Sequence, residues 1–323
     1  IYEECPITVA ASEEMLSLEG ADSTVITPED EQNILDIDSA NVVVDGFTFS
    51  SETDDSSADV TVTDSAQDAQ ILNSTFSGVG SDAESRTAIS ISSVSTTGPT
   101  VNNVDIDGYG TGIDVSVGSQ PATISNAEIT SSNVGIGLSG DAAHRVEDSS
   151  LTASGTGIDI DDQPTSDDKY EIVRNQIADN TVGIESNAGG NAVIHFNDIL
   201  NNADAGVDYA TDDQNNIDSL RANWWGDANG PDVSTETGAS IVEASENDVA
   251  NSNNNERPWL TSSYTELPTD RMVVVTDASA PPADADPSNA EGALVLVAVL
   301  DDDTATAANV DSGSTSFIVD GSD

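Results

Sequence analysis

The stretch Gly112-Ile-Asp-Val-Ser-Val117 decides the fold. Apolar and polar side chains alternate along it, which predicts a strand with one buried and one solvent-facing side. The start of this stretch recurs as Ala88-Ile89-Ser90, Gly112-Ile113-Asp114, Gly135-Ile136-Gly137, Gly157-Ile158-Asp159, Gly183-Ile184-Glu185 and Gly206-Val207-Asp208. The steps between copies are 24, 23, 22, 26 and 23 residues, so the chain repeats one unit.

A second motif runs in phase with the first. Its copies are Asn103-Val-Asp-Ile106, Asn126-Ala-Glu-Ile129, Asp148-Ser-Ser-Leu151, Asn175-Gln-Ile177 and Asn197-Asp-Ile199, with weaker ones at Gly46-Phe-Thr-Phe49 and Asn73-Ser-Thr-Phe76. Asn tolerates left-handed turn geometry and bonds to nearby backbone, so the recurring Asn predicts a stacked amide ladder. The recurring Gly of the first motif predicts a sharp turn with positive φ in each unit.

A unit of this length is too short for helical repeats, which need about 33 residues or more. It suits a coil of three short strands, and such coils bury their apolar faces only when stacked about 4.8 Å apart. Leucine-rich repeats have a similar period, but their fixed leucine pattern is absent. The predicted fold class is therefore all-β, a right-handed single-stranded parallel β-helix of about nine rungs over residues 1–250.

Two segments carry a family resemblance. Ile1-Tyr-Glu-Glu-Cys-Pro-Ile-Thr-Val9, with Leu16-Ser-Leu-Glu-Gly20, resembles the first rung of the NosD-like, pectate-lyase-like β-helix repeat domains, and Asn223-Trp-Trp-Gly226, with Gly230-Pro231, resembles their closing segment. The resemblance covers about residues 1–260. Polysaccharide lyases, epimerases, viral spikes and surface adhesins share this architecture, so the resemblance implies a fold and leaves the function open.

The pattern changes beyond the repeats. Residues 251–270 read as a linker, and three strands are expected in 271–323, at Arg271–Thr276, Ala293–Leu300 and Thr315–Val319. They resemble the first strands of the Ig-like modules that follow β-helices in surface adhesins. A whole sandwich needs about seven strands and about 100 residues, so this module is expected to be incomplete. Either the sequence stops early or a partner subunit adds the missing strands.

The charge balance points to a saline, extracellular setting. The chain has 60 Asp and Glu against 7 Lys and Arg, a net charge of −53, and Lys169 is its one lysine. Such charges repel one another in dilute buffer, whereas at about 1 M salt the screening length of this repulsion is roughly 3 Å. In this the chain resembles secreted proteins of halophilic archaea. Disorder is excluded because the chain is 36% hydrophobic, with periodic apolar residues.

Several classes of site lack the residues they need. Nucleic acid and anionic membranes need basic clusters, and no two basic residues are neighbours. No run approaches the roughly 20 apolar residues of a membrane span. His144 and His195 have no Ser or Cys partner at a recognisable spacing and form no zinc motif. Cys5 is either a lone buried thiol or half of a disulfide with a partner upstream.

Carboxylates recur in one slot of the repeat. Asp114, Asp159, Glu185 and Asp208 share this outward slot, which Gly137 interrupts. Stacked about 5 Å apart, they would raise one another's pKa or bind a cation, and oxygen ligands suit Ca²⁺ or Na⁺. The predicted ligands are Asp159, Asp161, Glu185 and Asp208. The alternative is an ordinary halophilic surface.

The resemblance to pectate lyases implies a chemistry for such a column. There, stacked carboxylates hold calcium against an acidic sugar, and an Arg or Lys takes the proton. Arg174 is the weak candidate for that base, but it aligns beside Asp148 of the rung below, and an ion pair between rungs explains it more simply.

Two further features have more than one interpretation. Trp224 and Trp225 are candidates to stack on a sugar, or they seal the open end of the core. The sequon Asn73-Ser-Thr75 is a glycosylation candidate, or Asn73 is simply a ladder residue.

The expected function is that of a non-enzymatic extracellular surface, filament or adhesin-type protein of a halophile. Its β-helix would be a rigid rod, and its partners would be other subunits, joined by strand addition. The alternatives are a calcium-dependent polysaccharide lyase and a protein that binds polysaccharide without turnover.

Overall fold

The computed structural model describes most of the repeat region and short pieces of the rest. The described residues are 7–10, 16–19, 25–27, 33–51, 57–78, 85–92, 97–116, 120–162, 169–187, 192–209, 220, 222–226, 241–243, 260, 263–264, 272–275, 295–298 and 306–309. Cys5, Gly230-Pro231 and the strand expected at Thr315–Val319 lie outside them.

Three parallel sheets form the body of the molecule, and from β1 to β25 consecutive strands belong to different sheets. Sheet A contains β1 (Ile7–Ala10), β4 (Leu35–Asp38), β7 (Ala58–Val62), β10 (Thr87–Ser92), β13 (Thr111–Ser116), β16 (Val134–Ser139), β19 (Thr156–Ile160), β22 (Val182–Ser186), β25 (Ala205–Tyr209) and β26 (Ile241–Glu243). Sheet B contains β2 (Leu16–Glu19), β5 (Val42–Asp45), β8 (Gln70–Leu72), β11 (Thr100–Asn102), β14 (Thr123–Ser125), β17 (Arg145–Glu147), β20 (Tyr170–Val173) and β23 (Ala192–His195). Sheet C contains β3 (Val25–Ile26), β6 (Thr48–Ser50), β9 (Thr75–Ser77), β12 (Asp105–Asp107), β15 (Glu128–Thr130), β18 (Ser150–Thr152), β21 (Gln176–Ala178) and β24 (Asp198–Leu200).

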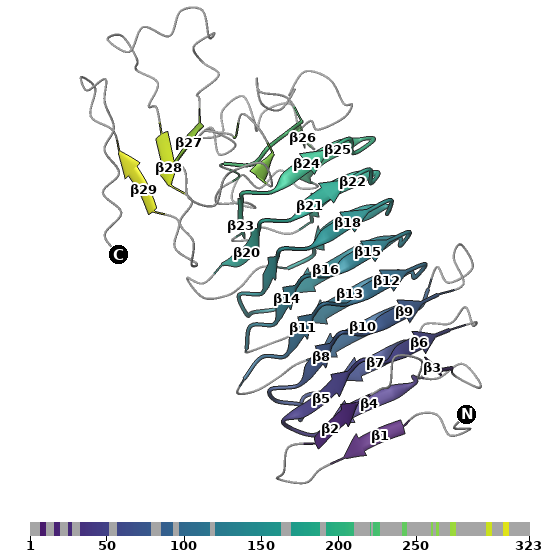
Figure 1. The fold of residues 1–323 in the computed structure, drawn as a ribbon. Helices are drawn as coiled ribbons and strands as arrows, with labels where there is room; N and C mark the ends of the chain where they lie inside the picture. Colours follow the sequence, from purple (N-terminus) through teal and green to yellow (C-terminus); the bar gives the residue numbers. More distant parts are fainter. Residues whose placement is uncertain are drawn as a thin grey trace, which may run out of the picture.

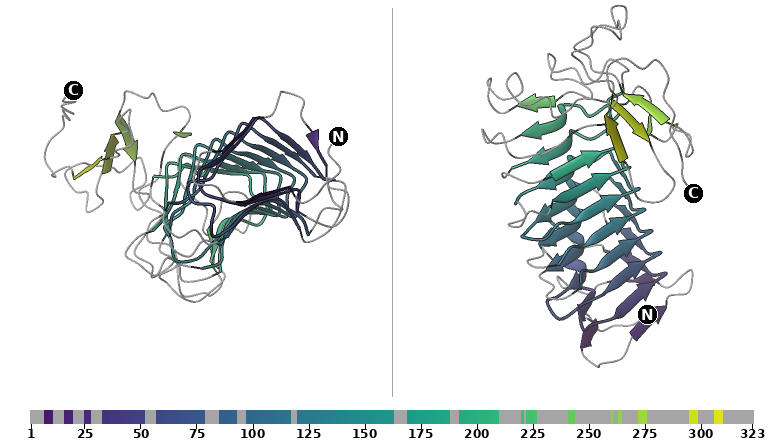
Figure 2. Two further views of the ribbon diagram at one scale, coloured as in Figure 1. Left: turned by 90° about the horizontal axis from the view of Figure 1, so that it is seen from below. Right: turned by 90° about the vertical axis from the view of Figure 1, so that its left-hand side faces the viewer.

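This strand order is that of a parallel β-solenoid. Each coil contributes one strand to each sheet in turn. Among the described residues, sheets B and C have 8 strands each, and sheet A has 10 because β25 and β26 follow the last complete coil. Eight described coils have a strand in all three sheets, one fewer than the nine rungs expected. The coils climb from the purple N-terminal strands to the green ones (Figure 1), and viewed along the stack they superpose (Figure 2, left). The described part contains no α-helix and therefore none that could span a membrane.

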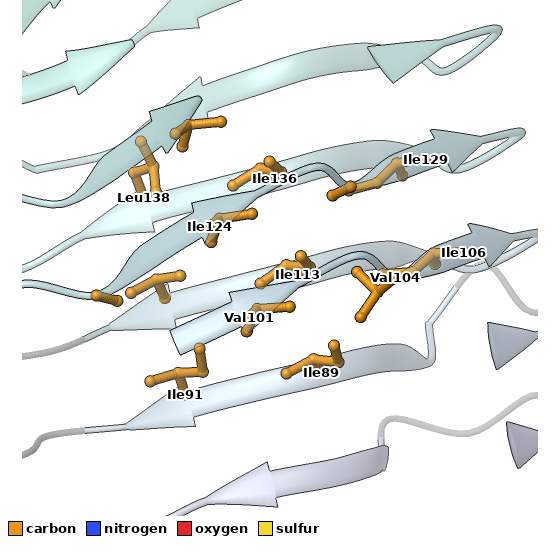
Figure 3. Close-up of a cluster of buried hydrophobic side chains, with 14 of the residues drawn as sticks. Ile89, Ile91, Val101, Val104, Ile106, Ile113, Ile124, Ile129, Ile136 and Leu138 are labelled. Carbon is orange, nitrogen blue, oxygen red and sulfur yellow. The ribbon is translucent and has the colours of Figure 1, made fainter. Parts of the chain in front are cut away.

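The core is a set of apolar columns. In sheet A, Ile89, Ile113 and Ile136 pair in register across β10, β13 and β16 and are fully buried. Val101 and Ile124 of sheet B, and Ile106 and Ile129 of sheet C, form parallel columns (Figure 3). Each buried residue therefore packs against a similar residue one coil above and below, and the alternating strand pattern of the sequence is confirmed.

The turn between sheets B and C uses two neighbouring positions for two different tasks. The first position has positive φ in every described coil from β5 onward, at Gly46, Asn73, Asn103, Asn126, Asp148, Arg174, Phe196 and Ala222. The next position points inward and carries the ladder, at Ser149, Asn175, Asn197 and Asn223. The expected amide ladder is confirmed, but Asn103 and Asn126 are turn residues, whereas Asn175 and Asn197 belong to the ladder.

A second ladder, which was not predicted, runs along the turn between sheets C and A. The backbone amide of Ser154 donates to Oδ1 of Asn180 at 3.0 Å, and that of Asn180 donates to Oδ1 of Asn202 at 3.1 Å. All three side chains are buried. The signal was a spacing of five residues, since Ser154, Asn180 and Asn202 each follow a residue of the first ladder by five.

The recurring glycines of the first motif do not have the predicted turn geometry. Gly112, Gly135 and Gly157 have ordinary φ angles, and a Cβ on each would lie 2.5 Å from the carbonyl oxygen of the glycine one coil further on. The expectation of positive φ was therefore wrong. In the strands from β13 to β22, two neighbouring residues face the interior, and the first of them is a glycine because the next coil leaves no room for a side chain there.

The C-terminal end of the solenoid is closed by two separated segments. Trp224 forms a parallel bridge with Asp198, and Trp225 after it is 2% exposed and belongs to the core. Leu260 is fully buried, and its amide donates to the carbonyl oxygen of Asn223 at 2.9 Å. Residues 222–226 and Leu260 therefore continue the stack beyond β24.

Three further strands form a separate antiparallel sheet, β27 (Met272–Val275), β28 (Val295–Ala298) and β29 (Thr306–Asn309). The first two lie within two of the ranges expected for the C-terminal module, and the third lies before its expected range.

Candidate functional site

The carboxylate column is formed as the repeat alignment predicts. Asp159 of β19 pairs with Glu185 of β22, and Glu185 pairs with Asp208 of β25. Asp114 of β13 pairs with Gly137 of β16, which separates it from Asp159. All four acidic side chains are partly exposed on the outer face of sheet A, because their neighbours in each strand point into the core.

The column has the electrostatics of crowded carboxylates. Partial burial, followed by the charges of Asp161 and Glu185, raises the pKa of Asp159 to about 6. Burial and the charge of Asp161 also raise the pKa of Asp114, and burial and the charge of Glu185 raise that of Asp208. These three aspartates therefore stay protonated to a higher pH than an ordinary aspartate does.

An amide joins two of the four predicted ligands. Nδ2 of Asn187 donates to Oδ1 of Asp159 at 2.8 Å and to Oδ1 of Asp161 at 3.1 Å. Asn187 follows β22, one coil further on, so these bonds hold neighbouring coils together. Among the described residues, no three Asp, Glu, His or Cys side chains converge as metal ligands would. The predicted cation site remains a prediction.

Arg174 lies in a dense ion-pair network away from this column. It donates from Nε and Nη2 to the two carboxylate oxygens of Asp148, both at 2.9 Å, and from Nη2 to Glu147 at 2.6 Å. These contacts raise its pKa further, with the Asp148 hydrogen bonds as the largest cause. The predicted ion pair between rungs is confirmed. A guanidinium held in this way is a poor acceptor for a substrate proton.

The network extends along sheet B. Arg145 donates to Glu171 on the next coil at 2.5 Å and to Glu147 on its own strand at 2.9 Å. Glu147 therefore accepts from both arginines. Because Arg174 follows a strand of sheet B, whereas the carboxylate column belongs to sheet A, the candidate base and the candidate ligands lie on different faces of the solenoid.

The two tryptophans differ in exposure. Trp225 is 2% exposed and packs in the core, which removes it as a sugar-stacking surface, whereas Trp224 is half-buried beside Asp198. The burial of Trp225 favours the predicted sealing role, which remains a prediction.

His144 is a buried structural residue. Its Nδ1 accepts from the amide of Ala122 at 3.1 Å, so Nε2 carries the proton and donates to the carbonyl oxygen of Ser139 at 3.2 Å. The ring stacks on Tyr170, with centroids 5.3 Å apart. Burial lowers its pKa to about 4, so it is neutral at neutral pH.

Three buried polar residues form a triad that the sequence pattern did not indicate. Arg86 donates from Nε to Oδ1 of Asp59 at 2.7 Å, and the Tyr109 hydroxyl donates to Oδ2 of the same carboxylate at 2.6 Å. Arg86 and Asp59 are fully buried and Tyr109 is 2% exposed. The three residues come from three successive coils, so the triad ties these coils together.

Comparison with known proteins bears on the fold. Residues 111–266 match the family model of a right-handed beta helix region. A search of curated proteins finds no match. The match agrees with the parallel solenoid topology of the described strands, which extends the same architecture back to β1.

Proposed function

We propose that this chain is a non-enzymatic structural protein of a cell surface or extracellular filament in a hypersaline medium, and that its β-helix is a rigid rod. One observation carries the proposal. Arg174 is bound through two nitrogens to Asp148 and lies on a different face from Asp159, Glu185 and Asp208. A lyase would need base and metal ligands around one sugar.

The packing of the described coils supports a stiff rod. Eight coils each have a strand in all three sheets, which gives a length of roughly 40 Å at the usual strand spacing. Side-chain ladders bind coil to coil at both turns of sheet C, for example from Asn175 to Asn197 and from Asn180 to Asn202. Because these bonds run along the stack, bending it would stretch buried hydrogen bonds.

The distribution of charge supports the saline setting. In the described part, Arg86, Arg145 and Arg174 are held in ion pairs with carboxylates. The remaining surface is dominated by carboxylates, in keeping with 60 acidic against 7 basic residues. Concentrated salt screens such a surface, whereas dilute buffer does not.

An activity assay tests the proposal against the lyase. The purified chain would be incubated in molar NaCl with Ca²⁺ and a panel of uronic-acid polysaccharides, and unsaturated sugar ends would be followed by ultraviolet absorbance. We expect no product. Product formation that disappears in Arg174→Ala and persists in Arg145→Ala would overturn the proposal, because both variants lose an arginine from the same network and only one loses the candidate base.

A further inference from the structure

Asn73 lies at an exposed corner of the rod. It is the positive-φ residue, at 49°, of the turn between β8 and β9, and its side chain is exposed. Ser74 after it points inward, where its hydroxyl accepts from the amide of Phe47 at 3.2 Å. Thr75 begins β9 and is exposed. Both ends of the sequon therefore face solvent while its middle residue is fixed in the fold.

The equivalent corners of the next coils have the same turn but lack the outward hydroxyl. Asn103 and Asn126 occupy the same turn position with φ of 54° and 52°. Two residues further on, the exposed first residue of the strand is Asp105 or Glu128 instead of a threonine. An N-linked sugar requires a Ser or Thr at that place. Of these three asparagine corners, only that of Asn73 combines the acceptor amide with an outward hydroxyl.

The amide of Asn73 can carry a substituent without losing its contacts. Nδ2 donates one hydrogen bond to Oδ1 of Asp45 at 2.7 Å, and Oδ1 accepts from Nδ2 of Asn103 at 2.7 Å. A substituted amide keeps one N–H and its carbonyl oxygen. The bonds to Asp45 and Asn103 therefore remain available after modification of this exposed side chain.

We propose that Asn73 is an N-glycosylation site. The donor is an oligosaccharide activated as a lipid-linked phosphate ester. Nδ2 loses one proton and bonds to the anomeric carbon, whose bond to the phosphate oxygen breaks, and the lipid phosphate leaves. The sugar then covers the corner formed by Asp45, Asn73 and Asn103. This inference rests on the proposed extracellular location, because such transfer occurs on exported chains.

Mass spectrometry of the protein from the cells that make it tests the site. Export is measured first, by labelling intact cells. The masses of the peptides that contain Asn73 and Asn103 are then determined. We expect a glycan on Asn73 and none on Asn103, which is the internal control. Asn73→Gln and Thr75→Ala should each abolish the added mass, whereas Thr75→Ser should retain it. Thr75→Ala leaves Asn73 and its two hydrogen bonds in place, so its effect reports recognition and not folding.

The outcomes separate the two proposals. An exported protein with unmodified Asn73 overturns the glycosylation site and leaves the structural role intact. A protein confined to the cell interior overturns the proposed function, and with it the site. A glycan that persists in Thr75→Ala would show attachment outside the sequon and would also overturn the assignment.

Discussion

The side chain of Asn175 donates a hydrogen bond from Nδ2 to Oδ1 of Asn197, one coil further on, at 3.0 Å, and both side chains are fully buried. The backbone amide of Asn175 donates to the same oxygen at 2.8 Å. Asn197 repeats the arrangement with Asn223. Each amide oxygen thus satisfies two donors that no water can reach, and the interior ladder is a continuous hydrogen-bonded chain.

Asn197→Ala should therefore be strongly destabilising. It leaves the buried amide of Asn175 and the carbonyl oxygen of Ile172 without their partner, and each such group costs about 1–3 kcal/mol. We expect a loss of about 3 kcal/mol in the free energy of unfolding, measured by denaturant titration in molar NaCl. Asn103→Gly is the control: it changes an exposed turn asparagine to the residue that Gly46 provides in an earlier coil, so its effect should stay below about 1 kcal/mol. Equal losses in the two variants would contradict a special role for the ladder.

The buried triad gives a second stability prediction. Asp59→Ala leaves the buried guanidinium of Arg86 without its carboxylate, and breaking such a pair typically costs about 3–5 kcal/mol. Tyr109→Phe removes one hydroxyl from the same carboxylate and should cost about 1 kcal/mol. Replacing Asp59 and Arg86 together by apolar residues should cost less than Asp59→Ala alone. A double variant less stable than the single one would refute this account.

The sequence predicted the residues that occupy equivalent positions in successive coils. Once one strand was aligned by its alternating pattern, the register of Asp159, Glu185 and Asp208 followed, because side chains in a strand have a period of two. Arg174 was likewise placed beside Asp148. The role of the recurring glycine was predicted wrongly. A close contact between coils and a positive φ both select glycine, so the sequence alone cannot distinguish them.

Contacts that do not repeat could not be predicted. Asp59 occupies the place that Ala88 and then Gly112 take in later coils, so it breaks the motif and gave no signal. Asp198 accepts hydrogen bonds from Ser263 and Tyr264, which lie 65 and 66 positions further along the chain, and no periodicity connects such positions.

Salt should control the fold as a whole. With a net charge of −53, lowering NaCl from molar to millimolar lengthens the range of repulsion from roughly 3 Å to more than 30 Å. We expect β-structure measured by circular dichroism to be lost, and the melting temperature to fall steadily before that point. A spectrum and a melting temperature that do not change would refute the hypersaline setting. Potassium chloride in place of sodium chloride should support the fold equally if screening alone is responsible.

The carboxylate column predicts a specific pH dependence. The pKa of Asp159 is about 6 in the fold and about 3.9 in an unfolded chain, so the fold binds more protons between these values. Stability linked to this group is therefore present at low pH and is lost as pH rises through about 6.

Asp159→Asn should thus raise stability at about pH 7, on the order of 1 kcal/mol after allowance for solvent screening, with little gain at about pH 4.5. The new amide can still accept from Asn187. Asp105→Asn, on the exposed face of sheet C, removes the same charge outside the column and is the control for net charge. Melting temperatures across this pH range, at constant molar NaCl, would measure the difference. A parallel gain in both variants would assign the effect to net charge instead of the column.

One buried carboxylate binds a segment at the C-terminal end of the solenoid. In the outer column of sheet C, Glu128 and Gln176 are exposed, whereas Asp198 at the last coil is 3% exposed. Its Oδ1 accepts from the backbone amide of Tyr264 at 2.8 Å, and its Oδ2 accepts from the hydroxyl of Ser263.

Asp198→Ala removes both of these contacts and should release residues 263–264 from the side of the solenoid while the coils remain folded. Hydrogen exchange at the Tyr264 amide should then accelerate at least tenfold, which corresponds to about 1.4 kcal/mol of lost protection. Gln176→Ala, one coil below in the same outer column, should leave that exchange rate unchanged. If the Tyr264 amide stays protected in Asp198→Ala, the buried Leu260 alone holds the segment, because its amide bond to Asn223 is independent of the carboxylate.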